Sequence, residues 1–300
     1  MSSADILLDA QRVSASRPGR DLFRELALTV RRGDRIGVVG INGCGKSTLL
    51  RVLTGDVEPE SGSVARARGV RVVVLEQEPE FVRPAGVAEW ELAAVCDRLG
   101  VSDLLDRDPA TLSGGQRKRL ALAAVLVDPG DVLVLDEPTN HLDLAAVAWL
   151  EERLASFPGA LVMVTHDRHF LDRVCTRLVE LDRGESFVHD GGYESYVAAR
   201  AERERRGVVA EEVRRNLARR ELEWLRRGAP ARTSKPRARI EAAEALLAER
   251  PKAAARAGEG LPLHFGTPRL GDFVVELDGV GHRFADGEWL FRDVSLALDP

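Results

Sequence analysis

The stretch Gly40-Ile41-Asn42-Gly43-Cys44-Gly45-Lys46-Ser47-Thr48 decides the fold of this 300-residue chain. An apolar run at residues 36–39 comes directly before it and predicts a buried strand. A helix is expected from Lys46 to about Leu53, with Gly55 as its left-handed cap. The glycines allow a tight turn whose backbone N–H groups face phosphate oxygens at the start of that helix. The pattern G-x-x-x-x-G-K-[ST] therefore predicts an α/β domain that binds a nucleoside triphosphate.

Two side chains of this loop carry most of the expected chemistry. Lys46 places a positive charge at the β- and γ-phosphates, and Ser47 offers its hydroxyl to Mg²⁺. Cys44 stands where a small residue suffices, and a redox role for its thiol is the alternative interpretation. The candidate phosphate-binding residues are Gly40, Asn42, Gly43, Cys44, Gly45, Lys46, Ser47 and Thr48.

Two adjacent acids follow a second apolar run, residues 131–135, which is typical of a buried strand in a parallel sheet. Asp136 is the expected ligand in the Mg²⁺ shell, because this ion prefers hard oxygen donors. Glu137 is the candidate general base for an attacking water. Solvation of an ordinary turn is the alternative, and the phosphate loop upstream argues against it.

Two further polar residues follow apolar runs of the same kind. Gln77 comes after residues 72–75 and fits a side chain that contacts the metal and the water. His166 comes after residues 161–164 and fits a γ-phosphate sensor, because the carboxyl ends of parallel strands meet at one sheet edge. Glu137, His166 and Gln77 form the predicted catalytic set, and Ser47, Gln77 and Asp136 form the predicted metal set.

Two further motifs narrow the family. Leu112-Ser113-Gly114-Gly115-Gln116 is followed by the run from Leu133 through Asp136-Glu137 to Asn140-His141-Leu142-Asp143. With the phosphate loop, these residues resemble the ATP-binding cassette superfamily over residues 5–196. The resemblance implies that Ser113 and Gly115 reach across a dimer interface to ATP held by a partner domain, with Asp143 at that interface. Two nucleotides would then be sandwiched between two domains.

The start of the chain resembles its end. Residues 12–17 and 21–24 parallel residues 279–284 and 289–292, and residues 8–30 correspond to about 277–298. Family members usually stack adenine on an aromatic residue here. Phe284 fills that position in the second copy, but Arg17 fills it in the first, so we expect the Arg17 guanidinium to stack on the base.

This repeat suggests three regions: a first cassette over residues 1–196, a basic helical linker over 197–258, and the start of a second, truncated cassette over 272–300. By the repeat, the second phosphate loop would begin about eight residues beyond Pro300, so we expect a piece of a two-cassette chain. ATP hydrolysis by the piece alone is expected to be weak.

Composition favours a globular protein, with 44% hydrophobic residues and a formal net charge of −5. The linker is an exception, with 17 Lys and Arg against 9 Asp and Glu over residues 197–258. The three cysteines lack paired spacing, which fits a reducing interior. We find no signal peptide, and the longest apolar run, residues 120–127, is far below the roughly 20 residues of a membrane span. A soluble, cytoplasmic protein is expected.

The linker predicts a helical hairpin. Residues 194–227 favour one long helix, residues 228–236 break it, and residues 237–249 favour a second helix. Six basic residues near the tip have no acid among them, which favours binding to a nucleic-acid backbone over a merely solvated helix face. They are Arg226, Arg227, Arg232, Lys235, Arg237 and Arg239.

The linker around Glu221-Leu222-Glu223-Trp224 and the motif Gly191-Gly192-Tyr193-Glu194 resemble the ABC-F family, with the Uup-type branch most similar. ABC-F proteins are twin-cassette ATPases without a membrane domain. The resemblance implies that the linker enters the ribosome and approaches tRNA near the peptidyl-transferase centre. Between Gln77 and Leu112 the chain lacks the longer helical arm of many members, so arm contacts do not transfer.

The expected fold class is α/β: an ATP-binding cassette (P-loop NTPase) domain with an antiparallel β subdomain and a helical subdomain, followed by the linker. The leading hypothesis is an ATPase that uses ATP and Mg²⁺ and acts on ribosome and tRNA. Alternatives are a DNA-binding ABC-F ATPase in genome maintenance, an ATP-gated clamp with little turnover, and the ATPase subunit of a transporter. The sequence does not distinguish a housekeeping translation factor from an antibiotic-resistance factor.

Overall fold

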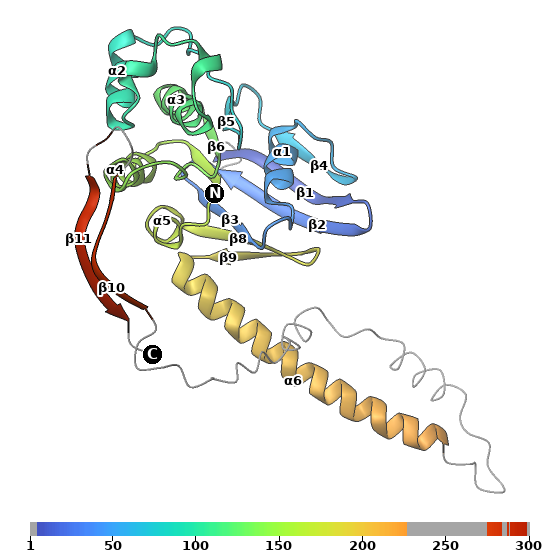
Figure 1. Ribbon diagram of the computed structural model, residues 1–300. Coiled ribbons are helices and arrows are strands. Elements are labelled where there is room, and N and C mark those ends of the chain that lie inside the picture. The colour runs from blue at the N-terminus through green and yellow to red at the C-terminus, as the bar shows by residue number, and fades with distance from the viewer. Residues whose placement is uncertain (1–4, 227–274, 284–286, 288, 299–300) are drawn as a thin grey trace, which may run out of the picture. The chain divides into compact units, whose positions relative to one another are not determined.

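The computed structural model describes residues 5–226, 275–283, 287 and 289–298. The chain divides into two units, the first ending at Ala255 and the second beginning at Arg256. The first unit is built around a six-stranded sheet in the order β5-β6-β7-β3-β8-β9 (Figure 1). Its strands are β3 (Arg35–Gly40), β5 (Val72–Leu75), β6 (Val132–Asp136), β7 (Ala160–Val164), β8 (Arg177–Asp182) and β9 (Glu185–Asp190). All neighbours are parallel except β8 and β9.

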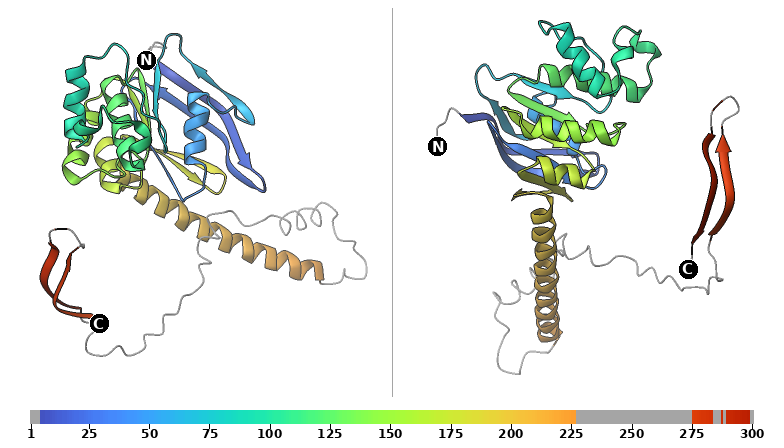
Figure 2. Two further views of the ribbon diagram at one scale, coloured as in Figure 1. Left: turned by 45° about the horizontal axis from the view of Figure 1, so that its top comes forward. Right: turned by 90° about the vertical axis from the view of Figure 1, so that its left-hand side faces the viewer.

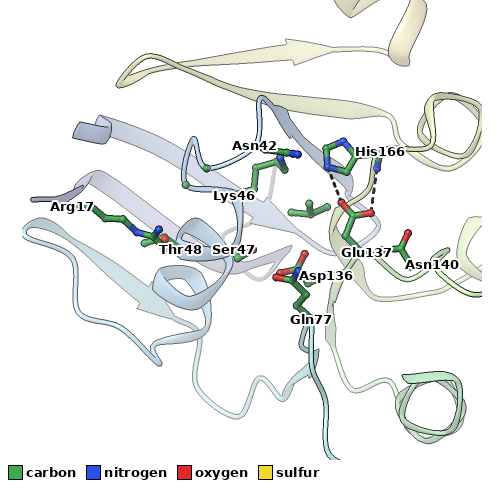
Figure 3. Close-up of a pocket in the computed structure, with 13 residues that line it drawn as sticks. Arg17, Asn42, Lys46, Ser47, Thr48, Gln77, Asp136, Glu137, Asn140 and His166 are labelled. Carbon is green, nitrogen blue, oxygen red and sulfur yellow. Dashed lines mark hydrogen bonds and ion pairs between the residues drawn. The ribbon is translucent and has the colours of Figure 1, made fainter. Parts of the chain in front are cut away.

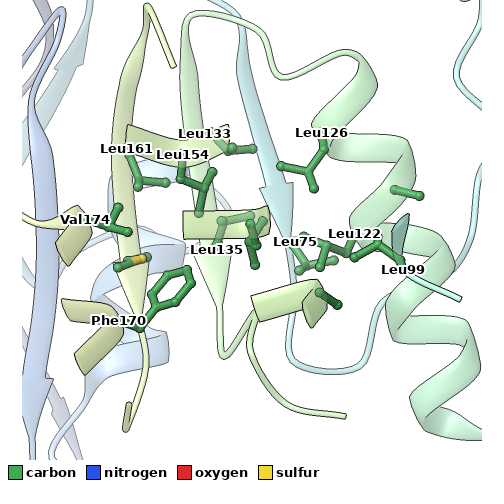
Figure 4. Packing of buried hydrophobic residues seen from close by; sticks show 14 of the residues in the cluster. Leu75, Leu99, Leu122, Leu126, Leu133, Leu135, Leu154, Leu161, Phe170 and Val174 are labelled. Carbon is green, nitrogen blue, oxygen red and sulfur yellow. The ribbon is translucent and has the colours of Figure 1, made fainter. Parts of the chain in front are cut away.

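Both faces of this sheet are covered by apolar side chains, as the continuous apolar runs predict. Alternation along β6 sends Val132 and Val134 to one face and Leu133 and Leu135 to the other. The first face packs against α1 (Lys46–Thr54) and a second sheet. The second face packs against α3 (Gly114–Val127), α4 (Leu144–Ala155) and α5 (Arg168–Val174) (Figure 4). The parallel sheet is therefore a rigid platform whose strand ends carry the polar residues.

The second sheet is antiparallel, in the order β2-β1-β4, with β1 spanning Ile6–Arg17, β2 Arg20–Arg31 and β4 Ser61–Arg66. It is joined to the central sheet by the Arg24 N–H, which donates to the Gly184 carbonyl at 2.9 Å. Its inward side chains, such as Phe23, Leu26 and Val13, are fully buried. The predicted antiparallel β subdomain is confirmed, and it places the end of β1 beside the phosphate loop.

The helical subdomain consists of α2 (Glu89–Arg98), two short 3₁₀ turns (Ser102–Leu104 and Pro109–Thr111) and α3. Ser113 begins α3 with a reciprocal capping box, in which its hydroxyl accepts from the Gln116 N–H and the Gln116 side chain accepts from the Ser113 N–H. α2 lies beside α3 (Figure 2). Leu92, Cys96 and Leu99 are buried in the same apolar cluster as Leu120 and Leu122 of α3. Between Gln77 and Leu112 the described residues thus hold one short α-helix and two 3₁₀ turns, without a longer helical arm.

The first arm of the linker is one helix, α6 (Tyr193–Arg226) of 34 residues, as the sequence predicts. It crosses the expected boundary at residue 196 without a break, and Tyr196 is buried in the same apolar cluster as Phe170 and Leu178. The expected second helix and the hairpin tip lie outside the described residues. The root of α6 thus belongs to the packed cassette.

The described part of the second unit is a hairpin of β10 (Val275–Arg283) and β11 (Trp289–Leu298). It repeats the register of β1 and β2: Leu8 faces Val30 as Val275 faces Leu298, and Ala15 faces Phe23 as His282 faces Phe291. Left-handed residues also recur at equivalent bulges, at Arg12 and Glu25 and again at Gly279 and Asp293. The sequence comparison paired Leu8 with about residue 277, and the strand register corrects this equivalent to Val275. The assignment of this hairpin to a second cassette remains a prediction.

Candidate nucleotide site

The phosphate loop closes tightly between β3 and α1, and two glycines make this possible. Gly45 precedes the first turn of α1 at φ 110°, and a Cβ there would lie 2.8 Å from Leu22 Cβ. Gly40 has φ 151°, and a Cβ there would lie 2.5 Å from the Leu181 carbonyl oxygen. Gly55 ends α1 in the left-handed conformation that the sequence predicts. A side chain at Gly40 or Gly45 would therefore open the loop.

Two loop residues face opposite ways. The Lys46 ammonium folds back over the loop and donates to the carbonyls of Gly40 at 3.0 Å and Ile41 at 3.4 Å. Cys44 is 2% exposed and packs inward with the apolar cluster beneath the loop. Burial raises the pKa of the Cys44 thiol, so the thiolate is disfavoured. The Cys44 side chain does not line the pocket. The backbone N–H of Cys44 donates a hydrogen bond to the Ile41 carbonyl at 3.2 Å.

A pocket of about 350 Å³ opens above the loop, and it gathers most of the predicted site (Figure 3). Asn42, Gly43, Gly45, Lys46, Ser47 and Thr48 line it from the loop and α1. Gln77, Asp136, Glu137 and His166 line it from the carboxyl ends of β5, β6 and β7 or the residues that follow them. Arg17 reaches it from the end of β1. Five separate segments of the chain therefore share one cavity.

Glu137 and His166 contact each other, an arrangement that the sequence does not reveal. Oε1 of Glu137 lies 3.4 Å from His166 Nε2, and Oε2 lies 3.4 Å from the His166 backbone nitrogen, whose N–H donates to it (Figure 3). The pairing follows from sheet order, because Asp136 is opposite Val164 in neighbouring strands. A second link between the same two segments joins the hydroxyls of Thr139 and Thr165 at 3.1 Å.

The backbone of Glu137 is held in an uncommon conformation. Its φ is 53°, and its N–H donates to the Val164 carbonyl at 2.8 Å. The residue is 8% exposed, and burial raises the pKa of its carboxyl group, while the charge of His166 acts in the opposite direction. A carboxylate with a raised pKa is a stronger base, so the burial suits proton acceptance.

The predicted metal ligands also meet. Ser47, Gln77 and Asp136 line the nucleotide pocket together, and the same three line a smaller cavity next to it. Among the residues that the structure describes, no group of three or more His, Cys, Asp or Glu could hold a metal by itself. One carboxylate with two neutral oxygen donors instead fits Mg²⁺ that brings phosphate oxygens as further ligands. The donor set therefore fits this ion.

Ser113 and Gly115 lie outside this pocket. Gly115 lines a separate groove of about 1000 Å³ with Gln77 and His141, and Ser113 is exposed at the start of α3. Their expected contact with ATP of a partner domain remains a prediction. Among the predicted nucleic-acid residues, Arg226 is the last residue of α6, whereas Arg227, Arg232, Lys235, Arg237 and Arg239 lie outside the described residues.

Two residues near the site escaped the sequence prediction. Asn140 lines both the nucleotide pocket and the neighbouring groove (Figure 3). Lys118 on α3 is 5% exposed, and its pKa is lowered by burial despite the attraction of Asp136 and Glu137. Asn140 belongs to a motif that the sequence analysis quotes, but no role was predicted for it there. Lys118 stands between Arg117 and Arg119, so no sequence pattern distinguishes it from its basic neighbours.

Fold and site together define an ATP-binding-cassette ATPase domain. Residues 23–140 match the family described as ABC transporter. A solved structure described as the ATP-binding subunit of an ABC transporter covers 61% of this chain and 90% of its own, with a TM-score of 0.54 and 20% identity, which supports the fold alone. Residues 23–140 therefore form a domain of the ATP-binding-cassette type.

The similarity to curated relatives extends beyond the domain. The energy-dependent translational throttle protein EttA of Mycobacterium tuberculosis (strain ATCC 25618 / H37Rv) is 35% identical, over 98% of this chain and 62% of the relative. EttA of Escherichia coli (strain K12) is 33% identical, over 94% of this chain and 60% of the relative. The ABC transporter ATP-binding protein YfmR of Bacillus subtilis (strain 168) is 36% identical, over 91% and 51%. The chain thus spans about half to three-fifths of the length of these relatives.

The described residues contain no helix that is both long enough and apolar enough to cross a bilayer.

Proposed function

We propose that this chain binds ATP with Mg²⁺ and belongs to a twin-cassette ATPase of the ABC-F type. The observation that carries the proposal is the single pocket shared by Lys46, Asp136, Glu137 and His166. Lys46 exchanges its loop carbonyls for β- and γ-phosphate oxygens. Ser47, Gln77 and Asp136 hold Mg²⁺, which offsets the negative charge of the phosphates when bound.

Glu137 acts as the general base in this proposal. Its carboxylate accepts the proton of the water that attacks the γ-phosphate, and His166 holds the carboxylate by two contacts. The left-handed backbone at Glu137 directs the side chain into the pocket rather than along the strand. His166 is 60% exposed at its side chain, so it also remains free to contact the γ-phosphate.

The active unit has two cassettes. Ser113 and Gly115 do not line the pocket of their own domain, and a partner cassette supplies the equivalent residues. The partner is the second cassette of the complete protein or a second copy. Turnover by residues 1–300 alone is weak for this reason.

The basic linker carries the target specificity, and we assign it to the ribosome and to tRNA in the cytoplasm. The similarity to proteins named translational throttle supports this assignment. The 34-residue α6 extends from the cassette (Figure 2). By sequence, Arg219, Arg220 and Arg226 fall in its last turns. An extended basic helix suits a phosphate backbone, because lysine and arginine neutralise phosphates without reading sequence.

The base assignment is tested in the complete protein. Changing Glu137 to Gln keeps the size of the side chain but removes the proton acceptor. ATP hydrolysis is expected to fall by about 10²–10⁴-fold, while ATP affinity stays within about threefold. Normal turnover by Glu137→Gln would show that another residue is the base.

The target is tested by ATP-dependent co-sedimentation with ribosomes, with and without bound tRNA. Replacing Arg226 and Arg227 by Gln is expected to weaken binding by about tenfold and to reduce its salt dependence. Replacing Arg205 and Arg206 by Gln is the matched control, because this arginine pair of the same helix is engaged by Glu202 near the root. Equal losses in both variants, or binding to branched DNA in place of ribosomes, would contradict the assignment.

A further inference from the structure

A buried carboxylate lies where α6 meets the central sheet. Glu180, in the middle of β8, is 1% exposed. Four side chains surround it: Tyr196 donates its hydroxyl at 3.2 Å, Arg200 and His189 approach within 3.5 Å, and Arg203 forms an ion pair with Oε2. Three of the four partners belong to α6. A charge this deeply buried is stable only with such partners.

The same contacts fix the angle of α6. Tyr196 packs its ring edge-on against His189 at 5.3 Å, and the Arg203 guanidinium lies 3.8 Å from the centre of the Phe187 ring. Beyond its root the helix exposes apolar side chains such as Val208, Val209 and Val213. Besides the apolar packing of Tyr196, directional polar contacts with β8 and β9 therefore hold the root.

Glu180 is one strand away from the phosphate loop. In the β3–β8 register it stands opposite Val39, and the next pair joins Leu181 to Gly40. The Leu181 carbonyl lies so near Gly40 that a Cβ there would approach it to 2.5 Å. A displacement of the loop at Gly40 would therefore be transmitted to the backbone of Leu181, the residue after Glu180.

A groove of about 370 Å³ makes the second connection. One wall is the phosphate loop with Asn42 and Lys46, and the other is the root of α6 with Tyr196 and Arg200. His166 also lines this groove. Asn42, Lys46 and His166 also line the nucleotide pocket, so groove and pocket share these three side chains. The Arg200 side chain is held in this position by hydrogen bonds that it donates to the Tyr196 hydroxyl at 3.1 Å and to the Glu204 carboxylate at 3.0 Å.

We propose that Glu180 is a positioning residue that seats the root of α6 as a wall of the groove beside the nucleotide site, so that a nucleotide bound at the phosphate loop and the basic helix influence each other. This inference rests on the proposed function, because it assumes that the pocket binds ATP. By reciprocity, a target that reorients α6 changes ATP affinity by the same factor.

The test is hydrogen–deuterium exchange of peptides covering residues 193–203, with and without Mg²⁺ and a non-hydrolysable ATP analogue, on the full 300-residue chain. In the parent chain the nucleotide is expected to slow exchange there by about threefold or more. Glu180→Gln is expected to bind the nucleotide with nearly unchanged affinity but to lose this response. The matched control is Glu211→Gln, because Glu211 is also buried and also pairs with two arginines, Arg214 and Arg215, but lies farther along α6.

A milder variant keeps the inference testable if Glu180→Gln does not fold. Tyr196→Phe removes one hydroxyl that joins Glu180 to Arg200 and keeps the ring, so about half of the response is expected to remain. A full response in Glu180→Gln, or in Tyr196→Phe if the former does not fold, would overturn the inference. So would a parent chain that binds nucleotide without any change in residues 193–203. A parent chain that binds no nucleotide would instead contradict the proposed function.

Discussion

Replacing Lys46 by Met separates the electrostatic role of the phosphate loop from its shape. Methionine retains most of the length of the lysine stem and removes the charge. In the structure the ammonium is 3.0 Å from the Gly40 carbonyl and 3.4 Å from the Ile41 carbonyl, so it is already held over the pocket and loses little freedom on binding phosphate. A hydrogen bond to a charged group contributes about 1.5–3 kcal/mol. Since 1.4 kcal/mol corresponds to a factor of ten, ATP affinity should fall about 10–150-fold.

Isothermal titration of ATP with Mg²⁺ into the 300-residue chain measures this change directly. The control is Cys44→Ala, two positions earlier in the same loop, whose side chain points into the apolar cluster below. This variant should lose stability by about 1 kcal/mol through the small cavity and keep its ATP affinity. An affinity for Lys46→Met within about threefold of the parent chain would refute the placement of the ammonium at the phosphates.

Three further outcomes follow from burial and packing. Arg17→Ala should weaken ATP binding about threefold to tenfold and leave binding of inorganic triphosphate unchanged, because Arg17 lines the pocket from β1 and is expected to contact the base; equal losses for both ligands would contradict base stacking. Gly37→Ala should destabilise the domain by about 1–3 kcal/mol in urea unfolding, since its Cβ would lie 2.6 Å from Leu178 Cδ2 and 2.7 Å from Leu171 Cδ2; a change below about 0.5 kcal/mol would show that this face of β3 is not tightly packed. At pH 8 the three native thiols should resist Ellman's reagent and react after unfolding. Burial raises the pKa of Cys96 to about 11, raises that of Cys175 to about 12, and also raises that of Cys44. Rapid labelling of any of these thiols in the native protein would contradict its burial.

The comparison of Cys44 with Lys46 shows what a motif alone leaves open. Both are part of the same nine-residue pattern, and the sequence predicts both as phosphate-loop residues. Only the packed structure distinguishes them, because the turn at Gly43 and Gly45 directs one side chain to the pocket and the other to the core. The position of Arg17 was inferred from the internal repeat, and the structure brings it to the pocket through the antiparallel sheet.

The sequence by itself determined the local units: the strand, loop and helix around the phosphate loop, the polar residues after the apolar strands, and the long basic helix. These features depend on neighbouring residues, whose glycine positions and apolar periodicity specify the backbone directly. Tertiary structure decided which units meet. The sheet order β5-β6-β7-β3-β8-β9 brings Glu137 against His166 and places Glu180 between the phosphate loop and α6. Strand order and the burial of a charge depend on long-range packing, which no local pattern in the chain specifies.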